Sequence, residues 1–151
     1  MTQSKQEIKA TNPKDAIGIT KVPLHMLSPV AKAHWALAQF VGNAKYGLVN
    51  WRAAPVRSSV YLAAMQRHMD AFLAGEAFDP VDGSHHLGNV MACCAILLDA
   101  EVAGTLIDDR PMFVDIRPTY GMVEEQMKTI AEKYKGVNPV HYTEDPALRG
   151  T

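Results

Sequence analysis

Hydrophobic residues recur along much of the chain every three to four positions, which is the spacing of one helical face. A helix is predicted over residues 29–47, because Ser28 is a favourable N-cap and Pro29 suits the first helical position. An amphipathic stretch at 122–136 predicts a last helix. Strand-type alternation is absent apart from a short stretch at 112–116. The pattern therefore predicts an all-α fold, in the form of a helical bundle.

Two more helices are predicted in the middle of the chain. One covers residues 60–74 behind a serine cap and stops at Gly75, and the other covers residues 85 to about 103 and stops at Gly104. Ser84 is the predicted cap of the second helix. That helix is apolar on nearly all sides, whereas an exposed helix has a single apolar stripe. It should therefore lie at the centre of a bundle or of an oligomer.

The first 28 residues are predicted to form an extended arm, because Pro13, Gly18 and Pro23 forbid a continuous helix. A chain of 151 residues with 48% hydrophobic residues is most simply one domain with a real core. The predicted order within that domain is an arm, a helical core and a C-terminal helix with its tail, over residues 1–28, about 29–107 and 112–151.

Charge and composition exclude several classes of function. The net charge is −1, and the basic residues are scattered, so neither a nucleic-acid groove nor an anionic membrane surface is predicted. The only cysteines, Cys93 and Cys94, are adjacent and imply no disulfide framework. The N-terminus lacks an apolar signal core, and Asp99 and Glu101 interrupt the longest apolar run, which leaves its uncharged part too short to span a bilayer. A soluble cytoplasmic protein is expected.

Ligand-type side chains crowd the connection before the central helix, in the stretch "GEAFDPVDGSHHLGN". On a helix His86 and Asn89 share a face, and buried polar groups need partners. Carboxylates suit Mg²⁺ or Mn²⁺, with an imidazole nearby. There are alternatives without a metal. The connection can be an ordinary solvated turn with His85 exposed, His86 can be a hydrogen-bonded histidine of the core, and Asn89 can form a hydrogen bond in helix packing. The predicted metal ligands are Glu76, Asp79, Asp82, His86 and Asn89.

A second cluster, "KYGLVNWR", lies between the first two helices of the core. Cationic, aromatic and amide side chains are what a nucleotide needs for its phosphates, its base face and its base edge. The alternative is a surface loop in which Trp51 is anchored in the core. For Arg67, on the following helix, the ordinary alternative is a surface salt bridge. The residues concerned are Lys45, Tyr46, Asn50, Trp51 and Arg52, with Arg67 and His68 on the following helix.

Ordered short motifs identify a family resemblance over residues 12 to about 111. The strings "NPKDAIG", "KVPL", "LSPVA", "AKYG" before "NWR", "RHMDAFLAGEAFD", "HHL", "ACCAILLDAE" and "LIDDRP" resemble a bacteriophage family of dATP/dGTP diphosphohydrolases, related to the MazG-like all-α pyrophosphatases. The resemblance implies a MazG-like helical bundle that forms dimers or dimers of dimers. It further implies cleavage of dGTP and GTP to the monophosphate and pyrophosphate, with the dGMP used to make a 2-aminoadenine nucleotide in a phage.

The metal motifs of MazG-like enzymes carry over only in part. Their Glu-Glu-x-x-Glu motif has no counterpart on the second core helix, where only Asp70 and then Glu76 are acidic. Their Glu-x-x-Asp motif matches Glu76-x-x-Asp79 or, by helix position, His86-x-x-Asn89. Nearer relatives have His-Leu-x-His at the latter place, so Asn89 departs from the family pattern.

The implied reaction requires metal ions to neutralise the polyphosphate and to activate a water. Glu76, Asp79 and His86 are then the catalytic candidates, since one of them must take the proton from water. Asn12 or Asn50 would contact the edge of the base, and Tyr46 or Trp51 would stack on its face. The phosphate-binding candidates are Lys14, Lys45, Arg52 and Arg67.

The role of the acidic pair after the central helix stays open at this stage. Asp108 and Asp109 lie about 30 Å along a straight helix from His86 at about 1.5 Å per residue, so any catalytic role would be in another subunit's site.

Two other functions compete with the one that the resemblance implies. An HD-type phosphohydrolase would release triphosphate, but its His-Asp pair would be split here by Met69. A non-catalytic helical binding module is the other alternative.

Overall fold

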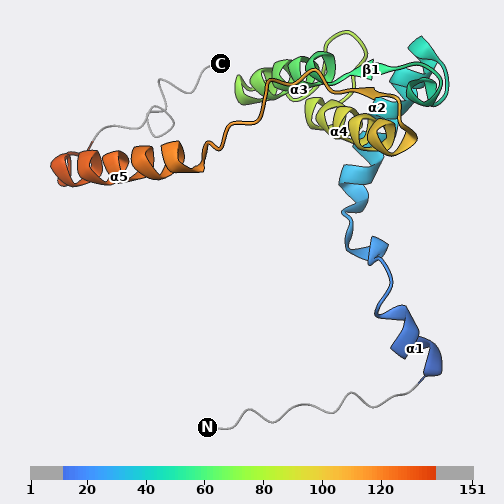
Figure 1. Cartoon of the computed structure of the whole chain (residues 1–151), viewed down its shortest axis with the longest axis horizontal. Helices are drawn as coiled ribbons and strands as arrows, with labels where there is room; N and C mark the ends of the chain where they lie inside the picture. Colours follow the sequence, from blue (N-terminus) through green and yellow to red (C-terminus); the bar gives the residue numbers. More distant parts are fainter. Residues whose placement is uncertain (1–11, 139–151) are drawn as a thin grey trace. The chain divides into compact units, whose positions relative to one another are not determined.

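A computed structural model of the chain describes residues 12–138, which divide into two compact units on either side of the Arg110–Pro111 bond. The chain is mostly helical, as predicted (Figure 1). The second unit contains α5 (Arg117–Lys133). The first contains α1 (Pro13–Gly18), η1 (Leu24–Met26), α2 (Pro29–Tyr46), η2 (Asn50–Arg52), β1 (Val56–Arg57), α3 (Ser58–Leu73), α4 (His86–Ala103) and β2 (Leu106–Ile107).

Helices α2 and α4 have nearly the predicted bounds, because local signals set their ends. The Ser28 side chain accepts a hydrogen bond from the backbone N–H of Ala31, and a glycine with positive φ follows the last residue of each helix. The start of α4 differs from the prediction. His85 is the N-cap, and its Nδ1 accepts from the N–H of Leu87 at 3.1 Å. The predicted cap, Ser84, instead bonds to the connection and to Asn89.

Helices α3 and α5 begin earlier than the apolar pattern indicated. Helix α3 starts at Ser58, two residues before the predicted range, and α5 starts at Arg117, five residues before it. Pro118 fits the first turn of α5, a position where proline is favourable even without an apolar stripe. The stretch at 112–116 forms no strand.

The strands that do form were not predicted. Val56 pairs in parallel with Leu106, and Arg57 pairs with Ile107. Two residues are too few to show an alternating pattern, and the partners lie 50 positions apart. This pairing holds the start of α3 beside the segment that follows α4.

Part of the predicted N-terminal arm is helical. The side chain of Asn12 accepts from the N–H of Lys14 at 2.9 Å, and Pro13 begins α1 behind it. Residues 1–11 of the arm and 139–151 of the C-terminal tail lie outside the described residues.

Helix α4 packs against both α2 and α3, as its all-round apolar pattern predicted (Figure 1). The approach to α2 is close at Gly88, where an added Cβ would lie 2.7 Å from the carbonyl oxygen of His34. The buried apolar side chains of α2 and α4 are alanines, Ala38, Ala92 and Ala100, so these helices meet with little side-chain volume between them. Gly88 therefore fixes the depth at which the start of α4 sits on α2.

By length and composition α4 is apolar enough to cross a membrane, which corrects the inference that its charged residues make the run too short. The same composition is expected of the central helix of a bundle. Asp99, one of those charged residues, is bonded to Arg52 and Trp51 of η2 within the first unit. Packing against α2 and α3 accounts for part of the apolar character of α4.

Candidate active site

A pocket of about 220 Å³ lies among α2, α3, α4 and η2. It brings together the two clusters that the sequence singled out, although they are separated by about 30 residues along the chain. Eight of the predicted site residues line it, namely Lys45, Tyr46, Asn50, Trp51, His68, Asp79, Asp82 and Asn89. Aromatic and amide groups come from the end of α2 and from η2, and the imidazole and carboxylates come from α3 and the α3–α4 connection.

The α3–α4 connection is folded back on itself, and this positions Asp79. The N–H of Asp79 donates to the carbonyl of Ser84 at 2.8 Å, and the N–H of His86 donates to that of Ala77 at 3.0 Å. The ring of His85 packs edge-on against Phe78, with centroids 5.0 Å apart. His85 is therefore half-buried, contrary to the expectation that it is exposed.

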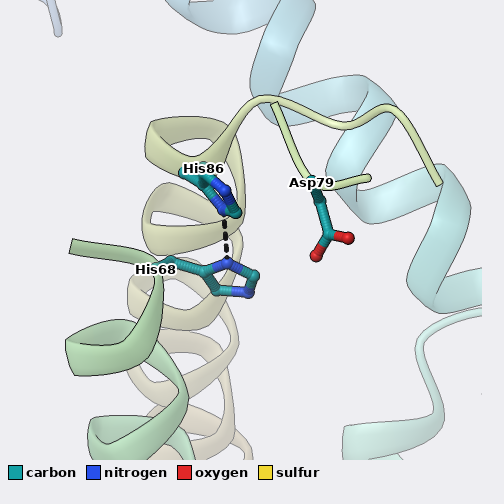
Figure 2. Close-up of side chains that lie close together, drawn as sticks. All are labelled: His68, Asp79 and His86. Carbon is teal, nitrogen blue, oxygen red and sulfur yellow. Dashed lines mark hydrogen bonds between the residues drawn. The ribbon is translucent and has the colours of Figure 1, made fainter. Parts of the chain in front are cut away.

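His68, Asp79 and His86 form a cluster of metal-ligand type (Figure 2). Each offers one ligand atom, and these atoms all lie within 4.8 Å of one another. His68 comes from α3, His86 is the buried first residue of α4, and Asp79 approaches from the connection. Two imidazole nitrogens and a carboxylate oxygen fit Mn²⁺ and other first-row transition ions better than Mg²⁺, which prefers oxygen ligands.

The two histidines are coupled. Nδ1 of His68 and Nδ1 of His86 lie 2.9 Å apart, so a hydrogen bond between them requires one nitrogen to donate and the other to accept. Burial, followed by the neighbouring His86, lowers the pKa of His68. The neutral form of His68 is favoured, and this is the form that binds a metal ion.

Glu76 lies behind His86 rather than in the cluster. One of its carboxylate oxygens is 3.3 Å from Nε2 of His86, and its side chain is half exposed. A carboxylate that accepts the second ring N–H of a ligating histidine fixes the tautomer and the orientation of the ring. The structure thus separates Glu76 from Asp79, which the sequence had paired as ligands.

Asp82 and Asn89 are engaged with protein groups. Asp82 accepts from Lys45 Nζ at 3.0 Å and from the Oγ of Ser84 at 2.5 Å. The bond from Ser84 and the one from Lys45 lower the pKa of Asp82 to about 2. The side-chain amide of Asn89 donates to Ser84 Oγ at 2.8 Å. These bonds join the end of α2 to the start of α4 across the pocket rim.

Arg52 does not line the pocket, and it is bonded to an acidic residue that the sequence had not placed in the site. Its Nε and Nη2 donate to the two carboxylate oxygens of Asp99 at 2.7 and 2.6 Å. The indole N–H of Trp51 donates to the same carboxylate at 2.6 Å. The bonds from Arg52 and Trp51 lower the pKa of Asp99 to about 2.

Comparison with known protein families gives a match to the part of the chain that holds the pocket. The family model described as dATP/dGTP diphosphohydrolase, N-terminal, matches residues 11–110, which is 100 of the 151 residues. The chain belongs to this family. Its activity class is that of a diphosphohydrolase, a hydrolase acting on nucleoside triphosphates. No curated protein and no solved structure matches the chain.

The pocket and the His68–Asp79–His86 cluster both lie within the matched diphosphohydrolase region. Three other predicted substrate-binding residues of this region, Asn12, Lys14 and Arg67, do not line the pocket. Asn12 serves instead as a cap for the short helix α1.

In the diphosphohydrolase region, the acidic residues that follow α4, Asp108 and Asp109, are bonded to protein groups. Asp109 accepts from the backbone N–H of Ser59 at 2.8 Å and from its hydroxyl at 2.6 Å, and so caps the start of α3. Asp108 forms a two-bond ion pair with Arg110. These contacts explain the two carboxylates without a site in another subunit.

Sequence reasoning missed several residues that line the pocket of this diphosphohydrolase, among them Gln39, Tyr61, Cys93 and Ile96. Helical spacing held a signal for most of them. On α4, Asn89, Cys93 and Ile96 recur every three to four positions, and on α3 Tyr61 precedes His68 by seven positions. Each set lies on one face of its helix, and those faces meet at the pocket.

Proposed function

We propose that the chain hydrolyses dGTP and GTP to the corresponding monophosphate and pyrophosphate, with a divalent cation held by His68, Asp79 and His86. The observation that supports this most strongly is that His68 and Asp79 of the metal-ligand cluster line the same pocket as an aromatic and amide wall, with the buried His86 beside them. The membership of the chain in a diphosphohydrolase family supports it independently.

The proposed ligand set differs from the one expected from the sequence. His68 replaces Asp82 and Asn89, which are bonded to Lys45 and Ser84. Glu76 becomes the residue that orients His86. Mn²⁺ suits this set better than Mg²⁺, because two of the three donors are imidazoles.

The reaction requires that the substrate be positioned and that the negative charge of its polyphosphate be neutralised. Water adds across the bond between the α-phosphorus and the oxygen bridging to the β-phosphorus, which yields the monophosphate and pyrophosphate. A bound cation would neutralise the polyphosphate and lower the pKa of the attacking water. One proton of that water must pass to a base, and we assign this role to Asp79, the carboxylate of the cluster.

The rest of the pocket provides contacts for the nucleotide. Lys45 lies on the rim, where the polyphosphate would compete with Asp82 for its ammonium group. Trp51 and Tyr46 offer aromatic faces to the base, and Asn50 and Gln39 offer amides to its edge. An amide presents both a donor and an acceptor, which can match the N1–H, N2–H₂ and O6 groups of guanine.

Guanine selectivity and the biological role rest on the resemblance within the family. The motifs are most similar to MazZ, the diphosphohydrolase of phages that replace adenine with 2-aminoadenine. On this proposal the enzyme works in the cytoplasm of the infected host, and its dGMP supplies the synthesis of the 2-aminoadenine nucleotide.

We further propose that the enzyme is a homo-oligomer, a dimer or a dimer of dimers. Large apolar side chains of the first unit are exposed, among them Phe40 at 69%, Leu98 at 65% and Val102 at 90%. Among the described residues, two buried polar atoms lack hydrogen-bond partners, Trp35 Nε1 and Asn43 Oδ1. An exposed apolar surface of this kind is what a partner subunit covers, and Trp35 and Asn43 line the same groove as Leu98 and Val102.

Product analysis tests the reaction. The purified chain is incubated with Mn²⁺ or Mg²⁺ and with dGTP, GTP, dATP or dCTP, and both products are identified. We expect pyrophosphate and a monophosphate, with kcat/KM for dGTP far above that for dATP, because hydrogen-bonding sites can discriminate by factors of roughly 10⁴. Release of inorganic triphosphate would instead identify an HD-type phosphohydrolase, and the absence of turnover would favour a binding module. Equal kcat/KM for dGTP and dATP would reject guanine selectivity alone.

A further inference from the structure

The turn that forms one wall of the pocket has a strained backbone. Val49, the residue before η2, has φ of 52° and is the one described non-glycine residue in the left-handed region. A β-branched side chain rarely adopts this conformation, and it persists only where surrounding contacts hold it. Asn50 and Trp51 follow directly and line the pocket.

One carboxylate on α4 supplies most of the side-chain contacts that hold this turn. Asp99 accepts three hydrogen bonds, one from the indole of Trp51 at 2.6 Å and two from the guanidinium of Arg52 at 2.7 and 2.6 Å. Two-bonded arginine–carboxylate pairs are among the strong and geometrically specific contacts in proteins. The hydroxyl of Thr105 adds a bond to the carbonyl oxygen of Trp51 at 2.7 Å.

Asp99 does not line the pocket, so it acts on a nucleotide only through the residues that it holds. It is on the same helix as His86, 13 residues further along. Trp51 of the aromatic wall and His86 of the metal-ligand cluster are thereby both held by α4, which relates the position of the base-binding wall to that of the cluster.

We infer that Asp99 is a positioning residue for nucleotide binding, which holds Asn50 and Trp51 in the conformation that receives the base. The inference rests on the proposed function. Arg52, which the sequence predicted to contact phosphate, would instead bond to Asp99 and so help to hold Asn50 and Trp51 in place. Arg52 is 61% exposed at its side chain while its donors point at Asp99, which agrees with this role.

The substitution Asp99→Asn tests the inference, because asparagine lacks the charge and the second acceptor oxygen that Arg52 and Trp51 share. We expect KM for dGTP to rise about tenfold or more, while kcat changes by less than about threefold, since the cluster on α3 and α4 is intact. Asp99→Glu, which keeps the carboxylate, should recover part of the loss. The matched control is Asp115→Asn in the second unit, which breaks a similar two-bond pair with Arg117 and should leave KM unchanged.

Calorimetric titration with a non-hydrolysable dGTP analogue and Mn²⁺ measures binding without turnover. Asp99→Asn should weaken this binding by a factor similar to the rise in KM. If that variant fails to fold, Arg52→Gln replaces it, because it removes two of the three bonds at an exposed side chain. An unchanged affinity overturns the inference, and tighter binding by Asp99→Asn would show that Arg52, once released, contacts phosphate. Failure of the wild type to cleave any nucleotide refutes the proposed function, whereas the titration still tests the role of Asp99.

Discussion

His86 shows how much the role of one side chain depends on its neighbours. It is buried at the start of α4, with one ring nitrogen 2.9 Å from His68 and the other 3.3 Å from Glu76. Glu76 would act on the proposed cation only through His86, whereas Asp79 would hold it directly. The two carboxylates should therefore differ in what their loss does to catalysis.

Removing the charge of Asp79 should be the more severe change. We expect Asp79→Asn to lower kcat/KM by about 10³-fold or more at any Mn²⁺ concentration, because a ligand and the proton acceptor are both lost. Glu76→Gln should raise the Mn²⁺ concentration for half-maximal rate by about 10- to 100-fold, with most of the rate restored at saturation. Initial rates across a Mn²⁺ titration measure both effects.

Asp70→Asn is the control for these two variants, because Asp70 is an exposed residue of α3 whose side chain bonds only to Gln66 among the described residues. It should behave as wild type. Full activity of Asp79→Asn at saturating Mn²⁺ would refute the proposed cluster, and a loss in Glu76→Gln that excess Mn²⁺ does not relieve would make Glu76 the proton acceptor.

The pairing of α2 with α4 depends on one glycine. A Cβ at position 88 would meet the carbonyl oxygen of His34 at 2.7 Å, and this contact is with backbone that cannot rotate away. Because His86 and Asn89 lie within two positions of Gly88, a shift of α4 here would also displace the start of the helix from the pocket.

We expect Gly88→Ala to lower the free energy of unfolding by about 1–3 kcal/mol, the usual cost of overpacking. Gly42→Ala is the matched control on α2. A Cβ there meets nothing within 4 Å, so alanine should stabilise the helix by about 0.5–1 kcal/mol. Urea unfolding of both variants gives the comparison. Equal stability of the two variants would mean that α4 does not approach α2 this closely.

The exposed apolar side chains of the first unit require an explanation that involves the whole molecule. Leu98 and Val102 lie one turn apart on α4, at 65% and 90% exposure, and they line the same groove as the unpaired Trp35 and Asn43. Single exposed apolar residues are ordinary, but a contiguous set on a central helix marks an interaction surface.

Light scattering should therefore give a native mass that is a multiple of 16.6 kDa at micromolar concentration. Leu98→Lys and Val102→Lys should shift the distribution toward the monomer, because a charge would be buried at the interface. Val81→Lys, at a residue that is 85% exposed on the α3–α4 connection, should not. A wild-type mass near 16.6 kDa would contradict the proposed oligomer.

The sequence alone predicted the helical class, the bounds of α2, the end of α4 and the neighbourhood of the candidate site. These features depend on contacts between residues that lie within a few positions of one another in the sequence. The Ser28 cap, a proline in the first turn and a glycine after the last turn act locally, so they can be read directly from the order of residues. The crowding of ligand-type side chains before α4 is likewise visible in one short stretch.

Only the tertiary structure decided which of those side chains meet. His68 and His86 lie 18 residues apart, Asp99 and Arg52 lie 47 apart, and the paired strands lie 50 apart. Helical spacing tells which residues share a face, but the rotation and depth at which two helices pack depend on contacts such as that of Gly88 with His34. For this reason the sequence grouped His68 and Arg52 with the nucleotide contacts and Glu76 with the metal ligands, whereas packing places His68 beside His86, Arg52 beside Asp99 and Glu76 beside His86.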